Sequence, residues 1–250
     1  MEFAKEKHFK ELKDVFTTVW LKDNNLYRTL QVPPHEFHQY VDIVFDRCRA
    51  VPWSASVGID LTLPSRSEDY RGQIVSFSFC QDYLNDMVPA ERFSLLSDRM
   101  KVIMEFNENA LEGIRANPLF TPLLRVPRAV LYGLHTGTIP SHVGRETAAG
   151  TISTRVGSLQ FLHCMRMGYC AFIGVCTHFE TARRAYLRMC ESKDTVIFSS
   201  LPFATWQPSS TAAIKYCQQY CGGEPPFKSI TQLPDAVGMI TAAPTLRARL

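Results

Sequence analysis

A short segment, Arg145 to Gly150, begins with a basic residue, ends in small residues and precedes a helix-length stretch, and this order constrains the fold more than any other feature. The stretch from Thr151 to Met167 is followed by a glycine turn and by an apolar run, Cys170 to Cys176, that predicts a buried strand. Small side chains let main-chain amides approach an anion, and a first helical turn adds unpaired N–H groups. The order predicts an α/β protein with a site for a phosphate-bearing ligand, although tight helix packing would also explain the small residues.

The composition indicates a soluble globular chain. Its 250 residues, 46% of them hydrophobic, are enough for a full core in one large domain or two small ones. A net charge of +3 gives no strong field that demands nucleic acid. No apolar run reaches the ~18 residues of a membrane span, and the charged start, Met1 to Lys7, does not resemble a signal peptide. We therefore expect a cytoplasmic protein with no nucleic-acid or membrane partner, present as a monomer or weak dimer.

The eight cysteines lie in apolar segments and contain no Cys-x-x-Cys pair, so we expect reduced thiols and no metal site. Cys217 and Cys221 are four residues apart and would share one helix face, where they could bind metal or cross-link. Because no paired histidine is near them, we interpret both as packing or surface residues.

Apolar spacing predicts a series of alternating elements. Helices are expected over residues 9–20, 34–50, 93–107 (with Leu95, Leu96, Met100, Ile103 and Phe106 inward), 151–167 and 180–190, and a short one within 207–223. Strands are expected over residues 57–63, 73–79, 129–134, 170–176, 195–201, 227–230 and 237–241, with loops at 117–127 and 135–144. One domain over residues 1–250 with a mobile tail at 245–250 would hold them all.

This order resembles the N-acyltransferase fold of the GNAT superfamily, and local motifs strengthen the resemblance. Asp23-Asn24-Asn25-Leu26 is similar to the Asp-Glu-Pro-Leu turn of insect dopamine-type arylalkylamine N-acetyltransferases, and Cys176 to Arg183 to their Cys-Ser-Ser-His-Tyr-Ser-Ala-Arg. Arg145 to Gly150 resembles the superfamily's acetyl-CoA loop, and weaker similarities lie at Leu201 to Trp206 and Pro226 to Lys228. The resemblance implies an α/β three-layer fold, in which helices flank a twisted mixed sheet with two splayed strands.

Acetyl-CoA, as co-substrate, is what the resemblance implies for the phosphate-bearing ligand. Its pantetheine arm would pair with main-chain groups of Tyr132, Gly133 and Leu134 between the splayed strands. Its pyrophosphate would rest on the helix start, with contacts from Arg145, Thr147, Ala148, Ala149, Gly150 and Thr151. Thr147 and Ala148 replace a basic residue and a glycine of the family, and a lost ionised contact costs about 1.5–3 kcal/mol. Arg145 is the candidate to compensate.

For catalysis the resemblance implies a carboxylate in the first motif and two hydroxyls in the second. The hydroxyls are present as Thr177 and Thr181, but Asn24 replaces the carboxylate, and an amide cannot accept a proton near neutral pH. Asp23, Glu180 and His178 are the replacement candidates. His178 is attractive because the ordinary pKa of a histidine is near neutrality, although a structural histidine is the commoner outcome.

The two hypotheses for function belong to different classes. The first is an acetyl-CoA-dependent N-acyltransferase that acetylates a primary arylalkylamine, and the second is a catalytically impaired relative that binds acyl-CoA or a partner. A longer acyl donor also stays open. Trp20 and Tyr27 flank the Asp23 turn and are the preferred amine contacts. The other aromatic candidates, which core packing would explain equally well, are Phe120, Phe179, Phe203 and Trp206.

Overall fold

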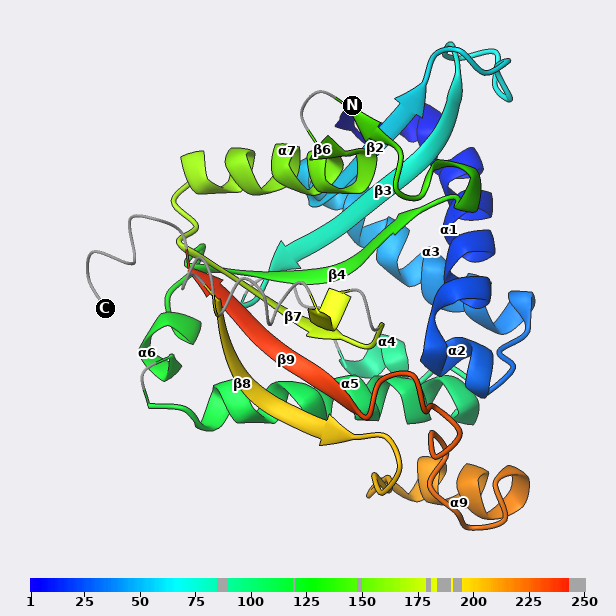
Figure 1. Cartoon of the computed structure of the whole chain (residues 1–250), viewed down its shortest axis with the longest axis vertical. Helices are drawn as coiled ribbons and strands as arrows, with labels where there is room; N and C mark the ends of the chain where they lie inside the picture. Colours follow the sequence, from blue (N-terminus) through cyan, green and yellow to red (C-terminus); the bar gives the residue numbers. More distant parts are fainter. Residues whose placement is uncertain are drawn as a thin grey trace.

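The computed structural model describes residues 1–84, 90–118, 120–147, 150–178, 181–183, 190 and 195–242. Its centre is a seven-stranded mixed sheet, shown in Figure 1. In spatial order the strands are β1 (Glu2–Phe3), β2 (Ala55–Asp60), β3 (Gln73–Asp82), β4 (Val130–Thr138), β7 (Ala171–Cys176), β9 (Asp235–Ala242) and β8 (Thr195–Pro202). The expected α/β class, with helices around a mixed sheet, is confirmed.

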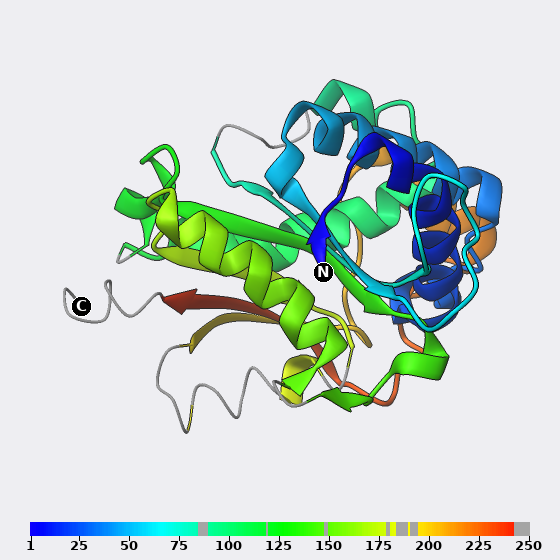
Figure 2. The ribbon, with the colours of Figure 1, turned by 90° about the horizontal axis from the view of Figure 1, so that it is seen from above.

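Helices cover both faces of this sheet. They are α1 (Phe9–Asp23), α2 (Asn25–Thr29), α3 (Pro34–Ala50), α4 (Ala90–Phe93), α5 (Asp98–Ala116), α6 (Thr121–Leu124), α7 (Ile152–Arg166) and α9 (Thr211–Tyr220). Figure 2 shows α7 on one face, and α1, α3 and α5 on the other. Within the described residues, no helix combines the length and the apolar character needed to cross a membrane.

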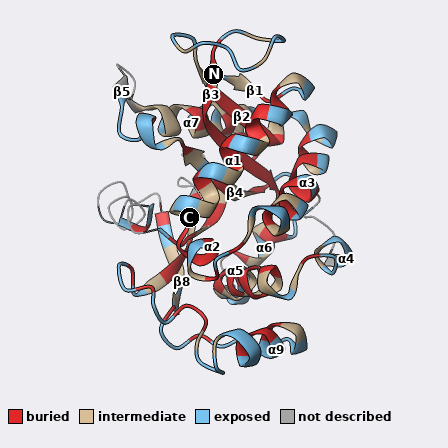
Figure 3. Ribbon diagram, turned by 90° about the vertical axis from the view of Figure 1, so that its right-hand side faces the viewer, coloured by how far each residue is buried: buried red, intermediate tan, exposed pale blue. Residues whose placement is uncertain are grey.

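Figure 3 shows that the sheet strands are largely buried. On the α1 and α3 side the buried side chains are mostly aromatic. Phe16 of α1 lies at the centre of this core, with its ring centroid 5.0 Å from Phe37 and 5.1 Å from Phe77. Phe79 and His135 lie at 5.0 and 5.1 Å from the same ring. The periodic apolar face of α1 therefore packs onto β3 and β4 through aromatic contacts.

Strands β4 and β7 form the only parallel pair in the described sheet, and they separate after a short contact. Their pairing begins at Val130 and Ala171 and ends at Gly133 and Gly174. Beyond this point β4 continues along β3 to Thr138, while β7 continues along β9 to Cys176. Each strand keeps its outer neighbour, so only the two facing edges lose a partner. The splayed strand pair expected from the sequence is present.

A β-bulge in β4 lies at the point of separation. His135 pairs with Phe79 and Gly133 with Cys80, so Leu134 has no partner in β3. A bulge inserts one residue and thereby exchanges the faces to which the following side chains point. It places His135 against the aromatic core of α1 and α3, whereas Thr136 reaches the α7 side and contacts Ser78.

Several sequence predictions match the observed elements closely. Helix α3 has the predicted bounds, β8 and β9 lie within one or two residues of theirs, and α9 is the expected short helix. Helix α7 begins one residue late because the Thr151 hydroxyl accepts a hydrogen bond from Thr154 N as N-cap. It ends at a turn in which Gly168 has φ +103°, a conformation that favours glycine.

Other predictions are wrong at their boundaries. Helix α5 starts at Asp98 rather than residue 93, because Ser97 caps it, and Leu95 lies outside it with 76% of its surface exposed. The predicted strand over residues 227–230 is a series of turns, with Lys228 N donating to Pro225 O. Consecutive prolines before it lack the N–H groups that a strand needs. The predicted loop at 135–144 begins as β4, which extends to Thr138.

Two predictions fall largely or wholly on residues that the structure does not describe. For the helix expected over residues 180–190, only residues 181–183 and 190 are described, and they are helical. The tail at residues 245–250 lies outside the described part of the chain.

Candidate functional site

A cavity of about 1500 Å³ passes through the gap between β4 and β7. At one end it is lined by the first turns of α7, including Thr151, Ser153 and Thr154, and in the middle by β4 and β7 residues such as Gly133 and Gly174. Its other end lies between the α1–α2 turn and the residues after β7. Ligand cavities usually measure ~300–1,000 Å³, so this one has room for two ligands end to end.

The middle of the cavity is suited to an extended ligand with amide groups. The edges of β4 and β7 that face each other beyond Gly133 and Gly174 are not paired to one another. Unpaired strand edges bind extended chains by main-chain hydrogen bonding. Tyr132, Gly133 and Leu134, predicted to hold a pantetheine arm, all line this part of the cavity.

The phosphate end differs in form from the predicted loop. Two short strands, β5 (Glu146–Thr147) and β6 (Gly150–Thr151), pair antiparallel, Glu146 with Thr151 and Thr147 with Gly150. Thr151 also caps α7, and its hydroxyl lies 3.1 Å from Ser153 Oγ and 2.8 Å from Thr154 Oγ1. Hydroxyl groups thus gather at the helix start, beside the main-chain amides of the first turn, which have no helical partner. Ala148 and Ala149 lie outside the described residues.

A hydrogen bond between His142 and the half-buried Asp60 holds the chain that leads into β5. His142 Nε2 lies 2.9 Å from Asp60 Oδ2 at the end of β2. Hydrogen bonds from His142, and then from Thr62, lower the pKa of Asp60 to about 2. Arg145, the predicted phosphate ligand, is exposed, with Nη1 3.5 Å from His142 Nε2, and does not line the cavity.

At the opposite end, two asparagines connect the α1–α2 turn to the end of β7. Asn24 Oδ1 accepts a hydrogen bond from Leu26 N at 3.0 Å, as N-cap of α2, and Asn24 Nδ2 donates to Thr177 Oγ1 at 3.4 Å. Asn25 Nδ2 donates to Thr177 O at 3.0 Å, and Arg28 Nη2 holds the other side of Asn25. Both amides are therefore used for structure, and Asn24 supplies no proton acceptor to the cavity.

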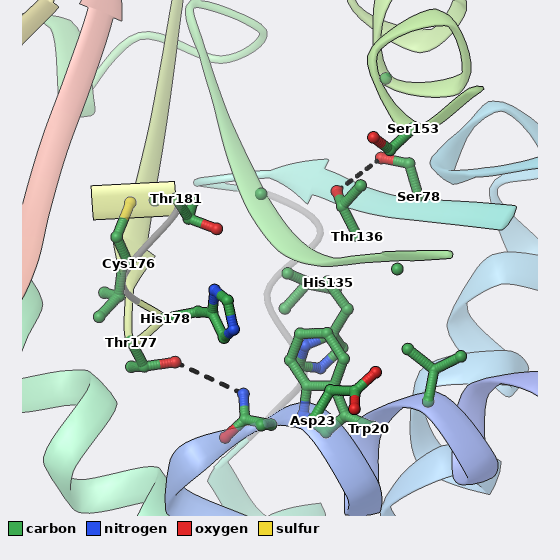
Figure 4. Close-up of a pocket in the computed structure, with 18 of the residues that line it drawn as sticks. Trp20, Asp23, Ser78, His135, Thr136, Ser153, Cys176, Thr177, His178 and Thr181 are labelled. Atoms are coloured by element: carbon green, nitrogen blue, oxygen red, sulfur yellow. Dashed lines mark hydrogen bonds between the residues drawn. The ribbon is translucent and has the colours of Figure 1, made fainter. Parts of the chain in front are cut away.

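The predicted catalytic side chains come together at this end, as Figure 4 shows. His178 and Thr181 are exposed to the cavity from the segment after β7, and Asp23 points toward it from the end of α1. Burial raises the pKa of the neighbouring Cys176 thiol to about 12. A thiol that stays protonated is a poor nucleophile.

The predicted amine contacts divide into two groups. Trp20 and Tyr27 line the cavity beside the α1–α2 turn. Phe203 does not; it is fully buried and stacks on Phe106 at 5.2 Å, so its prediction as an amine contact is not supported by its position. Phe120 and Trp206 are likewise buried in the core. Phe179 and Glu180 lie outside the described residues.

Sequence reasoning missed His135, which is 8% exposed and lines the cavity beside Trp20. Its ring centroid lies 4.4 Å from that of Trp20, and its Nε2 lies 2.5 Å from the Tyr40 hydroxyl. Burial lowers the pKa of His135 to about 3. The β-branched Thr136 and Thr138 could have indicated that the strand continues past Leu134, but no local pattern reveals the bulge.

Replacement of Asn24 tests the structural use of its side chain. Asn24→Asp keeps the acceptor for Leu26 N, so we expect the free energy of unfolding in urea to stay within about 0.5 kcal/mol of the wild type. Asn24→Ala removes the cap and should cost about 1 kcal/mol. Lys10→Ala, on the exposed side of α1, is the control. If Asn24→Ala behaves like that control, the asparagine link contributes nothing to stability.

The buried His135 should make the protein less stable in acid. Because its pKa is about 3 when folded and about 6.5 when unfolded, only the unfolded chain takes up the proton between these values. Stability is then lost as the pH falls below about 6.5, by about 2 kcal/mol between pH 7 and pH 5. Urea unfolding of the wild type and of His135→Gln between pH 7 and pH 5 measures this loss in the free energy of unfolding. The same pH dependence in both proteins would contradict the role of His135.

Comparison with known proteins gives structural matches only. No protein-family model and no curated protein sequence matches the chain. The C-terminal condensation domain of Ebony, solved with beta-alanyl-dopamine, has a TM-score of 0.68 at 15% identity, covering 96% of this chain and 97% of that one.

Two insect enzymes are similar over the same 96% of the chain. Drosophila melanogaster polyamine N-acetyltransferase, which forms N-acetylagmatine, has a TM-score of 0.64 at 12% identity over 98% of its chain. Arylalkylamine N-acetyltransferase 2 from Aedes aegypti has a TM-score of 0.61 at 9% identity over 97% of its chain. These similarities cover nearly the whole chain, and they show that it has the fold of the GNAT acetyltransferases.

Proposed function

We propose that the chain is an acyl-CoA-dependent N-acyltransferase that acetylates a primary arylalkylamine. The observation that carries the proposal is the separation of β4 from β7 with a continuous cavity through the gap. One end of this cavity offers amides and hydroxyls, and the other offers acid, imidazole and aromatic side chains. A nucleotide-bearing thioester and a small amine are ligands that such a cavity would bring together.

The residues at the phosphate end and in the gap fit acetyl-CoA. Thr151, Ser153 and Thr154 present hydroxyls at the start of α7, where the helix dipole favours an anion. The unpaired edges at Leu134 and Val175 suit the two amides of a pantetheine arm. When bound there, acetyl-CoA would supply the acyl group as a thioester. Arg145 lies near this end, but outside the cavity lining.

The proton must be removed from the attacking amine by a group at the other end of the cavity. His178 is our first candidate and Asp23 the second, because both side chains reach the cavity while Asn24 is held by Leu26 and Thr177. Removal of the proton leaves a neutral amine, the form that attacks the thioester carbon. Thr177 uses its oxygen to accept from Asn24, so its own O–H can donate to the reacting groups.

A second function, acyl-CoA binding without catalysis, is favoured by Asn24. The family's carboxylate is replaced by an amide whose two polar atoms both have partners. A protein that kept acyl-CoA binding and lost turnover would look like this.

Two measurements separate these functions. Titration calorimetry with acetyl-CoA tests binding. Bound acetyl-CoA at 100 times its Kd should also raise the free energy of unfolding by about 2.7 kcal/mol. Release of thiol from acetyl-CoA with dopamine, tyramine, tryptamine and spermine then tests turnover. Binding with turnover supports the enzyme, binding without turnover across these amines supports the acyl-CoA-binding protein, and absence of heat with acetyl-CoA refutes both.

A size series at Gly174 tests whether the acyl donor passes through the gap. A Cβ at this position would lie 3.4 Å from Phe172 and 3.9 Å from Met239, which are ordinary contacts, so Gly174→Ala should bind acetyl-CoA nearly as the wild type does. Gly174→Leu would extend into the cavity, and we expect its Kd to rise at least about tenfold, or 1.4 kcal/mol. Calorimetry measures both, with Tm as a check on folding. Unchanged affinity in Gly174→Leu would exclude this route.

Replacement of the proposed base tests the chemistry. His178→Ala should lower kcat about 100-fold, a typical loss for a general base, and alter the pH–rate profile. Asp23→Asn is the matched comparison from the opposite wall of the cavity. If His178→Ala leaves the profile unchanged and Asp23→Asn changes it, the base is the carboxylate.

A further inference from the structure

The bulge in β4 turns His135 toward Trp20, Tyr27 and Tyr40, and these four side chains form an aromatic corner of the cavity. The Trp20 ring lies edge-on to His135 at 4.4 Å, and the Tyr27 ring lies 6.3 Å from Trp20. All four side chains line the cavity on its α1 side. The corner is one turn of α1 away from Asp23, which lies on the same face of that helix.

The hydrogen bond with Tyr40 fixes the tautomer of His135. Burial lowers the pKa of His135 and raises that of Tyr40, so the imidazole is neutral and the hydroxyl keeps its proton. Among the described residues His135 Nε2 is the only hydrogen-bond partner of this hydroxyl, at 2.5 Å. Tyr40 therefore donates to Nε2, and the single imidazole proton is on Nδ1.

His135 Nδ1 is then a buried donor that no described residue satisfies. The indole N–H of Trp20 also has no partner in the described chain. Burial raises the pKa of Tyr27, and the nearby Trp20 indole N–H offsets part of that rise. The two groups nevertheless do not meet hydrogen-bond geometry. A buried N–H without a partner destabilises a protein, so this corner is incomplete until an acceptor enters it.

The chemistry of the corner selects among small amines. It presents two N–H donors and one hydroxyl without a partner among the described residues, and its four side chains include no carboxylate. A distal ammonium or guanidinium group brings only donors and would find a single acceptor, the Tyr27 oxygen. A ring hydroxyl can accept from His135 Nδ1 and donate to Tyr27, while its aromatic ring packs against Trp20.

We propose that His135 determines acceptor specificity by donating a hydrogen bond from Nδ1 to the ring hydroxyl of a phenolic arylalkylamine. This inference rests on the N-acyltransferase function proposed above. The amine end of such a substrate would lie toward Asp23 and His178, and the hydroxyl end toward His135. Amines with a second positive charge would be poor substrates.

Two substitutions of His135 separate the donor at Nδ1 from the hydrogen bond between Nε2 and Tyr40. His135→Gln can keep an acceptor for Tyr40 and loses the donor at Nδ1, whereas His135→Asn keeps an N–H at the Nδ1 position and loses the acceptor for Tyr40. Tyramine and 2-phenylethylamine differ only in the ring hydroxyl. The ratio of their kcat/KM values is the readout, with agmatine as the doubly charged amine and Tm as the check on folding.

We expect the wild type to prefer tyramine over 2-phenylethylamine at least tenfold, with agmatine poorer than either. The ratio should fall to about 1–2 in His135→Gln and stay well above that in His135→Asn. If His135→Gln does not fold, Trp20→Phe removes the other donor and should lower the ratio severalfold. A wild-type ratio near 1, a ratio retained in His135→Gln, or a preference for agmatine would overturn the proposal.

Failure of the proposed function gives a different result. In that case acetyl-CoA produces no heat on titration, whichever variant is used. If acetyl-CoA binds but no amine turns over, the thermal shift by each amine in the presence of CoA replaces kcat/KM. A larger shift with tyramine than with 2-phenylethylamine, lost in His135→Gln, supports the role of His135, and equal shifts overturn it.

Discussion

The separation of β4 from β7 is the constraint on which the rest of the structure depends. A strand in the middle of a sheet normally pairs along both edges, because a buried unpaired N–H or C=O costs free energy. Here the pairing stops at Gly133 and Gly174, while β3 and β9 hold the outer edges. The unpaired groups are thereby confined to one short gap, and they face a cavity in which a ligand can satisfy them. The bulge at Leu134 adds to this arrangement by directing His135 to the opposite face.

The other end of the cavity depends on side-chain amides. Asn24 and Asn25 connect the α1–α2 turn to Thr177, so that helix and strand end are held as one unit. Both polar atoms of the Asn24 side chain thus serve for support. If the site catalyses acyl transfer, His178 and Asp23 occupy the walls from which a proton could be removed.

The sequence was sufficient for the sheet class and the longer helices, and several of the predicted site residues line one cavity. Apolar periodicity depends on local spacing, which is why Pro34–Ala50 could be predicted with its bounds and the strand ending at Cys176 nearly so. Features that depend on contacts distant in the sequence were not accessible. The bulge at Leu134 is visible only in its register with β3, and the burial of Phe203 depends on Phe106. The pairing of β5 with β6, where the sequence predicted only a loop, is likewise a matter of register, Glu146 with Thr151 and Thr147 with Gly150.

The central sheet can be viewed as two smaller sheets joined by a narrow link. One contains β1 to β4 and the other β7, β9 and β8, and only four residue pairs, Val130–Gly133 with Ala171–Gly174, connect them. Side chains join the two parts elsewhere: Asn24 and Asn25 bind Thr177 at the end of β7, and one hydrophobic core contains residues of both parts, such as Phe77 and Val237. The gap is therefore held open by contacts on either side of it, and its width does not depend on a ligand.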